Sequence, residues 1–376
     1  MNKIKICLES FKCFEDITFY LNNITFLTGA NASGKSSLIQ ALLLADSTLT
    51  GCGGEETSEI TISLCDPQRA LDLGNVDNLI NHKGLDKVRI KIADTELEFR
   101  GEDEVSLGSL LMYINTNKEN TLGCITYLNA ERIGPRLETS LDKTNKQRCG
   151  CHGENTASVI LNNDFTKIPA SKCRQPNLDK ERNFRIELDS WLNLIFPGIS
   201  ITINSTGATK CQLMVNNERL EDKNVATNVG FGISYVLPIL VSCLLAKDNE
   251  TIIIENPEAH LHAKAQSNMG YFLGTMAASG LRILVETHSE HIINGVRRLL
   301  AGSEVLKPEA VTIYFMEAEE EQIKQTEISI DKDGNLSAFP IDFFDQQRQD
   351  SKDIFEHLRN RQIEEYGKHS DNTRRC

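Results

Sequence analysis

Residues 29–36 (GANASGKS) limit what this chain can fold into more than any other segment. They fit the pattern G-x-x-x-x-G-K-[ST], follow the β-rich run Ile24–Leu27, and open a segment whose leucines recur at helical spacing. The glycines permit a tight loop whose backbone N–H groups converge on a phosphate, and the helix amino terminus adds partial positive charge. The sequence therefore predicts a strand, a phosphate loop and a helix over 35–45.

This phosphate loop makes ATP with Mg²⁺ the expected ligand. Lys35 is expected to reach the β- and γ-phosphates, and the hydroxyl of Ser36 is expected to ligate Mg²⁺. The residues of this segment that we assign to the nucleotide are Gly29, Asn31, Ser33, Gly34, Lys35, Ser36 and Ser37.

A second motif supplies a carboxylate for the metal. Residues 251–255 (TIIIE) read as a buried strand that ends in an acid, at the edge where open α/β sheets bind ligands. A buried acid without a partner is costly, so the sequence predicts that Glu255 binds Mg²⁺ together with Ser36. His260 and His262 follow, but no third ligand accompanies them, so we interpret both as structural.

A third motif, residues 284–289 (LVETHS), places His288 just beyond the next strand. A neutral imidazole at this point is expected to hydrogen-bond a γ-phosphate and to sense its loss. A helix over 262–278 lies between the two strands, and this strand–helix–strand spacing predicts a parallel crossover.

Length and charge bound the remaining possibilities. The chain has 376 residues, and 40 Lys and Arg against 53 Asp and Glu give a net charge of −13. That length allows two domains, or one large α/β head with an insertion. The longest apolar run, 236–246, is shorter than the ~20 residues that span a bilayer, and the first residues lack an apolar signal core. We therefore expect a soluble cytoplasmic protein with no membrane partner.

Patterning along the chain suggests further elements. We expect strands over 3–8, 17–21, 58–65, 88–93, 95–99 and 123–129, a loop-rich insertion over 137–183, a helix over 186–195, a hairpin over 199–216, a buried helix over 232–246, and a charged helix over 345–366. The acidic run 317–321 reads as a solvated surface.

Two local features leave alternatives open. Residues 140–185 carry nine basic and five acidic residues, so this segment is either a contact for nucleic-acid phosphates or a solvated loop. A second feature is one tight cluster of possible metal ligands, Cys149, Cys151 and His152, with Cys173 further along the chain. Zinc needs about four ligands, so we favour an unliganded loop over a zinc site. The other cysteines read as reduced, packed thiols.

The three motifs together resemble ABC-type ATPase heads of the SMC, RecF and OLD group. The opening residues 8–14 (LESFKCF) are similar to the first strand pair of those heads, which implies that Lys12 also contacts nucleotide. Residues 228–238 (NVGFGISYVLP) occupy the place of the signature motif. This likeness implies that Gly230, Gly232 and Ser234 meet a γ-phosphate held by another subunit.

The resemblance implies a fold class and a domain order. The fold is an α/β P-loop ABC-type ATPase head with a mixed β-sheet core, an antiparallel β meander and a helical lobe, without a long coiled coil or a TOPRIM domain. The expected parts are 1–136 and 226–345 for the head, 137–225 for the insertion and lobe, and 346–376 for a charged helix and tail. Residues 72–74, 127–136, 153–157 and 343–348 are further similar to small OLD-like ATPases of bacterial anti-phage systems such as Septu.

The implied function is an ATPase that dimerises head to head around ATP and Mg²⁺. Its cycle would gate a partner effector, a nuclease encoded nearby, in anti-phage defence or DNA maintenance, with nucleic acid as the expected trigger and DNA as a possible partner. The alternative is an ATP-dependent clamp or sensor with negligible turnover. An autonomous nuclease is disfavoured because no catalytic cluster presents itself.

One departure bears on the rate. Many ABC heads have Asp-Glu at the end of this strand, whereas this chain has Glu255 and Asn256. Asn256 cannot act as a general base, so Glu258 or a water held by His288 would serve. We therefore expect slow hydrolysis, with Glu255, Asn256, Glu258 and His288 as the catalytic set.

Overall fold

The computed structural model describes residues 2–51, 59–84, 87–100, 109–115, 122–144, 147–175, 183–218, 222–228, 230–320 and 322–372. It divides into two units, Met1–Ser337 and Ala338–Cys376, and each is described by itself.

The first unit is built on a six-stranded sheet in the order β10-β15-β16-β3-β17-β18, whose first five strands are parallel. Helices on both sides bury the parallel strands, which explains their nearly continuous apolar sequences. The crossover from β15 to β16 runs through α5, as the spacing predicted. The bounds are β3 (Ile24–Gly29), β10 (Ile125–Leu128), β15 (Thr251–Glu255), β16 (Arg282–Glu286), β17 (Val311–Glu319), β18 (Gln322–Ile328), α5 (Ala263–Ala278) and α6 (Glu290–Gly302).

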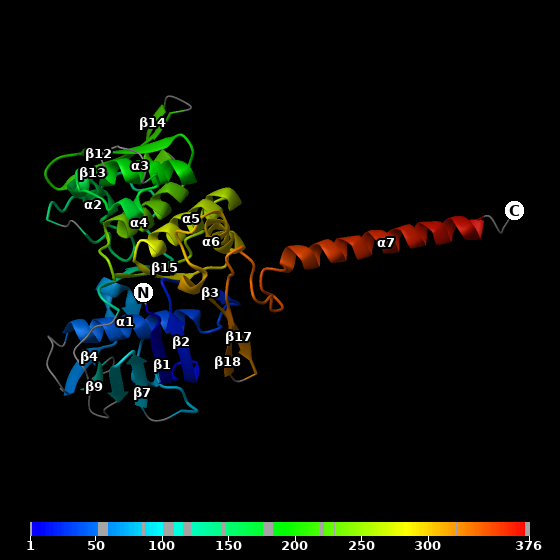
Figure 1. Ribbon diagram of the computed structural model, residues 1–376, viewed down its shortest axis with the longest axis horizontal. Coiled ribbons are helices and arrows are strands. Elements are labelled where there is room, and N and C mark those ends of the chain that lie inside the picture. Colours follow the sequence, from blue (N-terminus) through cyan, green and yellow to red (C-terminus); the bar gives the residue numbers. More distant parts are fainter. Residues whose placement is uncertain are drawn as a thin grey trace. The chain divides into compact units, whose positions relative to one another are not determined.

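A second, antiparallel sheet has the order β2-β1-β7-β8-β9-β4, and α1 packs between it and the parallel sheet (Figure 1). One apolar cluster therefore joins α1, the meander and the parallel strands, and this core fixes where the phosphate loop lies. The structure adds β9 to the expected meander and extends α1 beyond residue 45. The bounds are β1 (Ile4–Phe11), β2 (Phe14–Leu21), α1 (Lys35–Gly51), β4 (Glu59–Ser63), β7 (Lys87–Ile92), β8 (Thr95–Arg100) and β9 (Ser109–Asn115).

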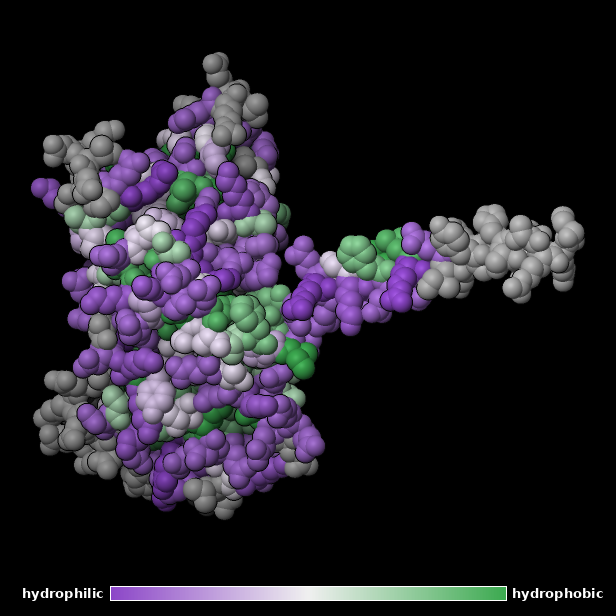
Figure 2. Space-filling model, turned by 45° about the vertical axis from the view of Figure 1, so that its right-hand side comes forward, coloured by the Kyte–Doolittle hydropathy of each residue, from purple (hydrophilic) through white to green (hydrophobic). Residues whose placement is uncertain are grey.

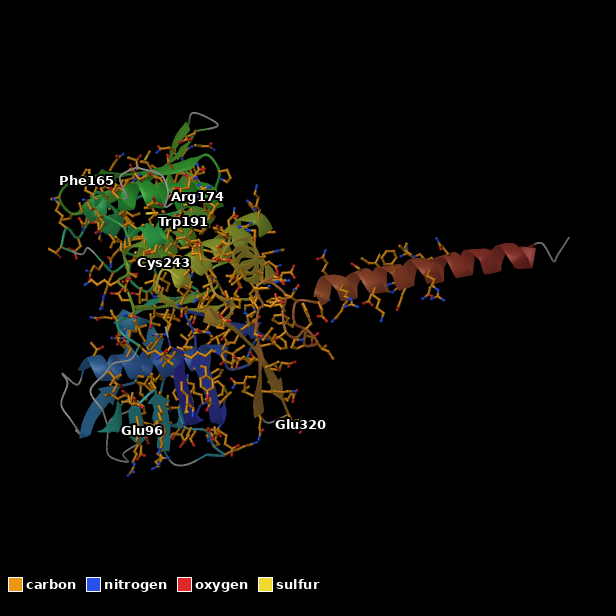
Figure 3. All side chains as sticks on the ribbon, in the orientation of Figure 1. Glu96, Phe165, Arg174, Trp191, Cys243 and Glu320 are labelled. Carbon is orange, nitrogen blue, oxygen red and sulfur yellow. The ribbon has the colours of Figure 1, made fainter. Side chains whose placement is uncertain are left out.

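Helices and a small sheet form a lobe on the side of the parallel sheet that faces away from α1 (Figures 1 and 3). Its elements are β11 (Thr139–Ser140), α2 (Thr156–Asn163), α3 (Phe184–Ile195), β12 (Ile199–Ser205), β13 (Lys210–Asn217), β14 (Asp222–Val225) and α4 (Gly232–Leu245). The buried Trp191 anchors the lobe: its ring packs edge-on against Phe272 at 5.0 Å, and its Nε1 donates to the carbonyl of Lys172 at 3.0 Å.

The insertion differs from the expected open loop in two ways. It contains α2, and Lys172 is 1% exposed, so this residue does not belong to a basic surface. Its ammonium donates to the carbonyl of Cys243 at 3.0 Å and also to that of Ala246. These are unsatisfied carbonyls at the carboxyl end of α4, where a cation is favoured by the helix dipole. The insertion therefore caps the helix that carries the signature-like turn.

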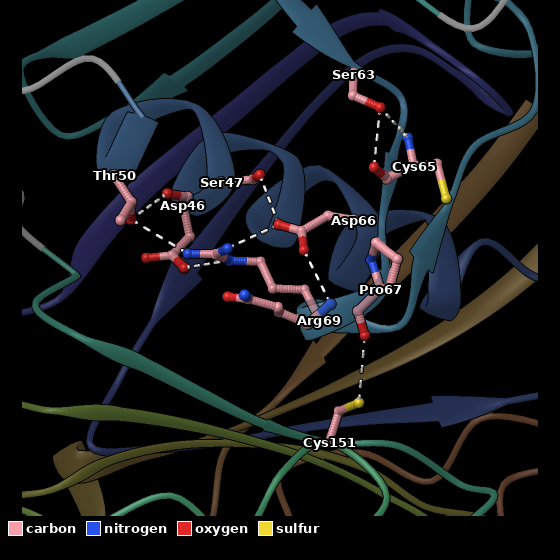
Figure 4. Close-up of polar contacts among 10 residues, drawn as sticks. Asp46, Ser47, Thr50, Ser63, Cys65, Asp66, Pro67, Arg69 and Cys151 are labelled. Atoms are coloured by element: carbon pink, nitrogen blue, oxygen red, sulfur yellow. Dashed lines mark hydrogen bonds and ion pairs between the residues drawn. The ribbon is translucent and has the colours of Figure 1, made fainter.

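A polar network ties α1 to the loop between the short strands β5 (Cys65–Asp66) and β6 (Leu71–Asp72) (Figure 4). Arg69 makes ion pairs at 2.7 Å with both Asp46 on α1 and Asp66. Burial raises the pKa of Asp46 even though Arg69 opposes the shift. The carboxylate therefore depends on Arg69 to stay charged.

We expect Arg69→Met to lower the free energy of unfolding by about 2 kcal/mol, because it leaves the largely buried Asp46 without its cation. Urea unfolding of both proteins measures the loss. The control is Arg89→Met, whose ion pairs with Glu9 and Glu98 are about a third exposed on the arginine side and are expected to matter by less than about 1 kcal/mol. Equal losses in the two variants would contradict this assignment.

The second unit consists mainly of α7 (Gln346–Asn372). Most described side chains of α7 are exposed, and they include the apolar Ile354, Phe355 and Leu358. Figure 2 shows hydrophobic surface, in green, on this helix. Within the described residues, no helix is both long enough and apolar enough to cross a membrane.

Candidate nucleotide site

The phosphate loop connects β3 to α1, as predicted, and two of its glycines are required by the packing. A Cβ on Gly29, whose φ is +130°, would lie 2.0 Å from the carbonyl oxygen of Met316. A Cβ on Gly34, at φ +88°, would lie 2.9 Å from the ring of Phe14. A side chain at Gly29 would clash with the backbone of β17, and one at Gly34 would have to displace the Phe14 ring; both positive φ values also favour glycine.

The Lys35 side chain is 4% exposed and folds back over this loop. Its Nζ donates to the carbonyls of Gly29 at 3.1 Å and Ala30 at 2.6 Å, and it lies 4.0 Å from the carboxylate of Glu286. Burial lowers the pKa of Lys35, and the charge of Glu286 opposes that shift. A phosphate arriving at the loop would exchange these carbonyl contacts for stronger, charge-assisted ones.

Glu255 stands at the carboxyl end of β15, as expected of a metal ligand. It accepts hydrogen bonds from the Tyr127 hydroxyl at 3.0 Å and from the backbone N–H of Ala130 at 3.3 Å. Burial raises the pKa of Glu255, and these two hydrogen bonds oppose the shift. With the exposed hydroxyl of Ser36, it offers the oxygen ligands that Mg²⁺ prefers.

Glu286 is a site residue that the sequence analysis missed. It ends β16, directly opposite Glu255 in the register, and it is 8% exposed. Burial and then the charge of Glu255 raise its pKa to about 7, while Lys35 opposes the shift. The available signal was an acid after three apolar residues of a buried strand, but the sequence analysis assigned the site role to the nearby His288 instead.

We expect the raised pKa of Glu286 to make stability depend on pH. The folded protein holds the proton up to about pH 7, whereas an unfolded glutamate releases it near 4.5, so the free energy of unfolding falls as pH rises between these values. The fall is on the order of 2 kcal/mol. Urea unfolding at pH 5 and pH 8 without nucleotide should show it, and Glu286→Gln should flatten it. The exposed Glu304→Gln serves as the control, and an equally flattened slope there would refute the assignment.

Glu258 reaches back to the segment after β16. Its carboxylate accepts hydrogen bonds from the Thr287 hydroxyl at 2.7 Å and from the His288 backbone N–H at 2.8 Å. Partial burial lowers the pKa of His288, as does the charge of Lys35, and Glu258 opposes both. Glu258 therefore positions the segment that carries His288, and the imidazole is neutral at pH 7.

Asn256 lies in the turn between β15 and α5 with a left-handed φ of +44°. Its backbone N–H donates to the carbonyl of Glu286 at 2.9 Å, which ties the turn to the end of β16. Asparagine adopts the left-handed backbone more readily than most residues, although here its buried side-chain oxygen has no hydrogen-bond partner among the described residues. The structure thus gives a conformational reason for asparagine at a position where many related heads carry an acid.

Other predicted residues lie elsewhere. The ammonium of Lys12 donates to the Gln40 side chain at 2.7 Å, so its described contact is with α1. Gly230 is exposed, and Gly232 and Ser234 begin α4, with Gly232 packed against the turn that contains His260. The structure therefore brings Lys35, Glu255 and Glu286 together at one edge of the sheet, while the signature-like turn lies beside the 256–260 turn.

The remaining histidines and cysteines have structural contacts. His262 caps α5 by accepting from the Ala265 N–H at 3.4 Å, and His260 packs against the rings of Phe231 and Tyr235. Throughout the described ranges, no three His, Cys, Asp or Glu side chains form a metal-binding group.

The segments that form this site match known ATPase families. The AAA ATPase domain family matches residues 126–293, and the AAA domain family matches residues 5–169. A family described as a protein of unknown function (DUF3696) matches residues 306–354. No curated protein matches the chain. The two AAA matches span the phosphate loop and both acidic strand ends, and they support ATP binding and hydrolysis.

Solved structures with similar folds include two SMC heads. An SMC head bound to the C-winged helix domain of ScpA is 10% identical, with a TM-score of 0.51, and the match covers 88% of this chain and 99% of that one. An SMC head with an extended coiled coil, bound to the C-terminal domain of ScpA and derived from Pyrococcus furiosus, is 10% identical, with a TM-score of 0.50 and coverage of 95% and 99%. The fold is that of an SMC-type ATPase head. This confirms the predicted fold class.

Proposed function

We propose that this ATPase head binds ATP with Mg²⁺ and dimerises around it, and that its slow cycle gates a partner effector. The observation that carries the proposal is the meeting of Lys35, Glu255 and Glu286 at the carboxyl edge of the parallel sheet. The residues present fit a magnesium ion. Ser36 and Glu255 would hold Mg²⁺, and the bound ion would neutralise the charge of the phosphates.

Self-association is supported by the surface at the start of α4. Phe231, which precedes that helix, is 53% exposed, and its ring packs against the exposed His260. The adjacent Gly230 and Ser234 leave backbone N–H groups at a helix amino terminus, where a phosphate of a second subunit would be favoured. A dimer would cover the phenyl ring and complete both nucleotide sites.

The experiment is to measure phosphate release and molecular mass with ATP and Mg²⁺, with and without duplex DNA. We expect slow release and an ATP-dependent dimer, and Phe231→Ser should weaken the dimer. A protein that remains monomeric at saturating ATP would contradict the dimer. An ATP-dependent dimer without measurable release would favour the clamp, the alternative that Asn256 supports.

The basic part of the insertion is the candidate contact for DNA. Arg185 is not free to join it, because it pairs with Asp189 at 3.1 Å, and Lys172 is buried; Lys146, Lys180 and Arg182 lie outside the described residues. This leaves Lys143, Arg148, Lys167 and Arg174 among the described cations.

We expect neutralising Lys143, Lys146 and Arg148 together to weaken DNA binding and to reduce the slope of log affinity against log salt by up to about 3. Titration of labelled duplex DNA at several salt concentrations measures both quantities. The control is Lys324→Ala, since Lys324 pairs with Glu319 on the β17–β18 hairpin. An unchanged slope in the triple variant would leave the segment a solvated loop.

The partner is proposed as a nuclease encoded nearby that acts in anti-phage defence or DNA maintenance, as the resemblance to OLD-like ATPases implies. Co-purification from the native host, followed by a nuclease assay of the complex with and without ATP, tests this. Recovery of the head without an effector, or with one that is not a nuclease, would refute that part of the proposal.

A further inference from the structure

Arg132 follows β10 and is a buried cation, 3% exposed. Its Nη1 donates to the carbonyls of Asn129 at 2.9 Å and Glu255 at 2.7 Å, and its Nη2 donates to the carbonyl of Asn256 at 2.6 Å. Among the described residues it has no carboxylate within ion-pair distance, although burial lowers its pKa and the charges of Glu258 and Glu255 oppose that shift. Burying a cation without an ion-pair partner is costly, so the three backbone hydrogen bonds must supply the compensating stabilisation.

The other face of the same guanidinium contacts the helix that bears the signature-like turn. The guanidinium carbon lies 5.3 Å from the ring centre of Tyr235, a cation–π contact with the first turn of α4. The Tyr235 ring in turn packs edge-on against His260 at 4.6 Å. A Cβ on Gly232 would lie 2.9 Å from the carbonyl of His260, so the helix and the turn are in close contact.

The turn itself is held from two sides. The N–H of Asn256 bonds to the end of β16, and its carbonyl accepts from Arg132, which fixes the left-handed backbone at this residue. The same guanidinium thus contacts the segment after β10, the turn after β15 and the start of α4.

We propose that Arg132 is a positioning residue that locks the turn after β15 to the amino end of α4. This inference rests on the proposed function, because it gives the signature-like turn a place at the nucleotide of a second head. Through this tie, the carboxylate of Glu255 and the turn at Gly230–Ser234 keep one fixed spacing within each head. A head that binds ATP at its own phosphate loop then presents its signature-like turn to the partner in register.

Lysine cannot replace this arginine. The planar guanidinium directs its N–H groups in fixed directions to three carbonyls while its face lies on an aromatic ring, whereas an ammonium is a compact point charge. Arg132→Lys keeps the charge and loses the fork, which makes it the decisive variant.

The first test compares binding with turnover. We expect Arg132→Lys to lower kcat at least tenfold and to weaken ATP-dependent dimerisation, with the Kd for ATP within about threefold of the wild type. Tyr235→Leu should act in the same direction, and Tyr235→Phe, which keeps the ring, should lose less. The double variant Arg132→Lys/Tyr235→Leu should lose less than the product of the single effects, because both break one tie.

The second test needs no nucleotide. Hydrogen exchange in Arg132→Lys should rise in residues 256–260 and 231–235 together. The matched control is Arg282→Lys, since Arg282 is 5% exposed in the same sheet but begins β16, at the opposite edge from Glu286. That control should change neither segment.

A kcat within threefold of the wild type, or exchange that rises in one segment alone, would overturn the inference. If the wild type neither hydrolyses ATP nor dimerises, the proposed function fails instead, and the exchange experiment still decides whether Arg132 joins the two segments.

Discussion

Replacing Lys35 by alanine is expected to weaken ATP binding by about 3–4 kcal/mol, roughly 10²–10³-fold in Kd. The variant removes the ammonium that would contact two phosphate groups at a site where burial strengthens charge-assisted hydrogen bonds. Isothermal titration calorimetry with ATP and Mg²⁺ measures the loss directly.

The loss must be separated from collapse of the loop, because Lys35 also bonds to the carbonyls of Gly29 and Ala30. A thermal unfolding midpoint close to that of the wild type shows that the loop survives. Lys264→Ala removes an exposed lysine near the start of α5 and serves as the charge control. Wild-type affinity in Lys35→Ala would mean that residues 29–36 do not bind phosphate.

Introducing a carboxylate at Asn256 is expected to raise single-turnover hydrolysis about 10²-fold, at the lower end of what a general base contributes. Part of the gain is offset, because the left-handed backbone at this residue is less favourable for glutamate than for asparagine. Asn256→Asp keeps the conformational preference but has a shorter side chain, so it should gain less if reach matters. Rapid-quench measurement of one turnover gives the rates.

Glu258 is the other candidate base, and its two hydrogen bonds provide a way to separate its roles. Glu258→Gln should slow hydrolysis, and Thr287→Val, which removes only one of those bonds, shows how much of the loss comes from positioning His288. Glu255→Gln should instead impair Mg²⁺-dependent binding. A wild-type rate in Glu258→Gln would make Glu258 purely structural, and an unchanged rate in Asn256→Glu would show that a base at this turn does not limit hydrolysis.

Local sequence was sufficient for the parts of this protein whose chemistry is carried by adjacent residues. The phosphate loop needs glycines, a lysine and a hydroxyl within eight positions, so residues 29–36 and the helix after them were predictable. The buried strands 251–255 and 282–286 were predictable from their apolar runs, and the spacing between them indicates a parallel crossover. Glu255 was predicted as a site residue because it directly follows such a run, and His288 because it lies just beyond the next strand.

Only the tertiary structure could decide which distant residues share an environment. The register of β15 and β16 places Glu286 beside Glu255, and the fold brings Lys35 to the same buried edge of the sheet. There, burial and then the charge of Glu255 raise the pKa of Glu286. Lys172 does not belong to the predicted basic surface, because its ammonium is buried against carbonyls at the carboxyl end of α4. The sequence determined the chemistry available at each strand end, and the packing of strands that are far apart in the chain determined which charges and carbonyls meet. Burial depends on every neighbour at once, and no local pattern contains that information.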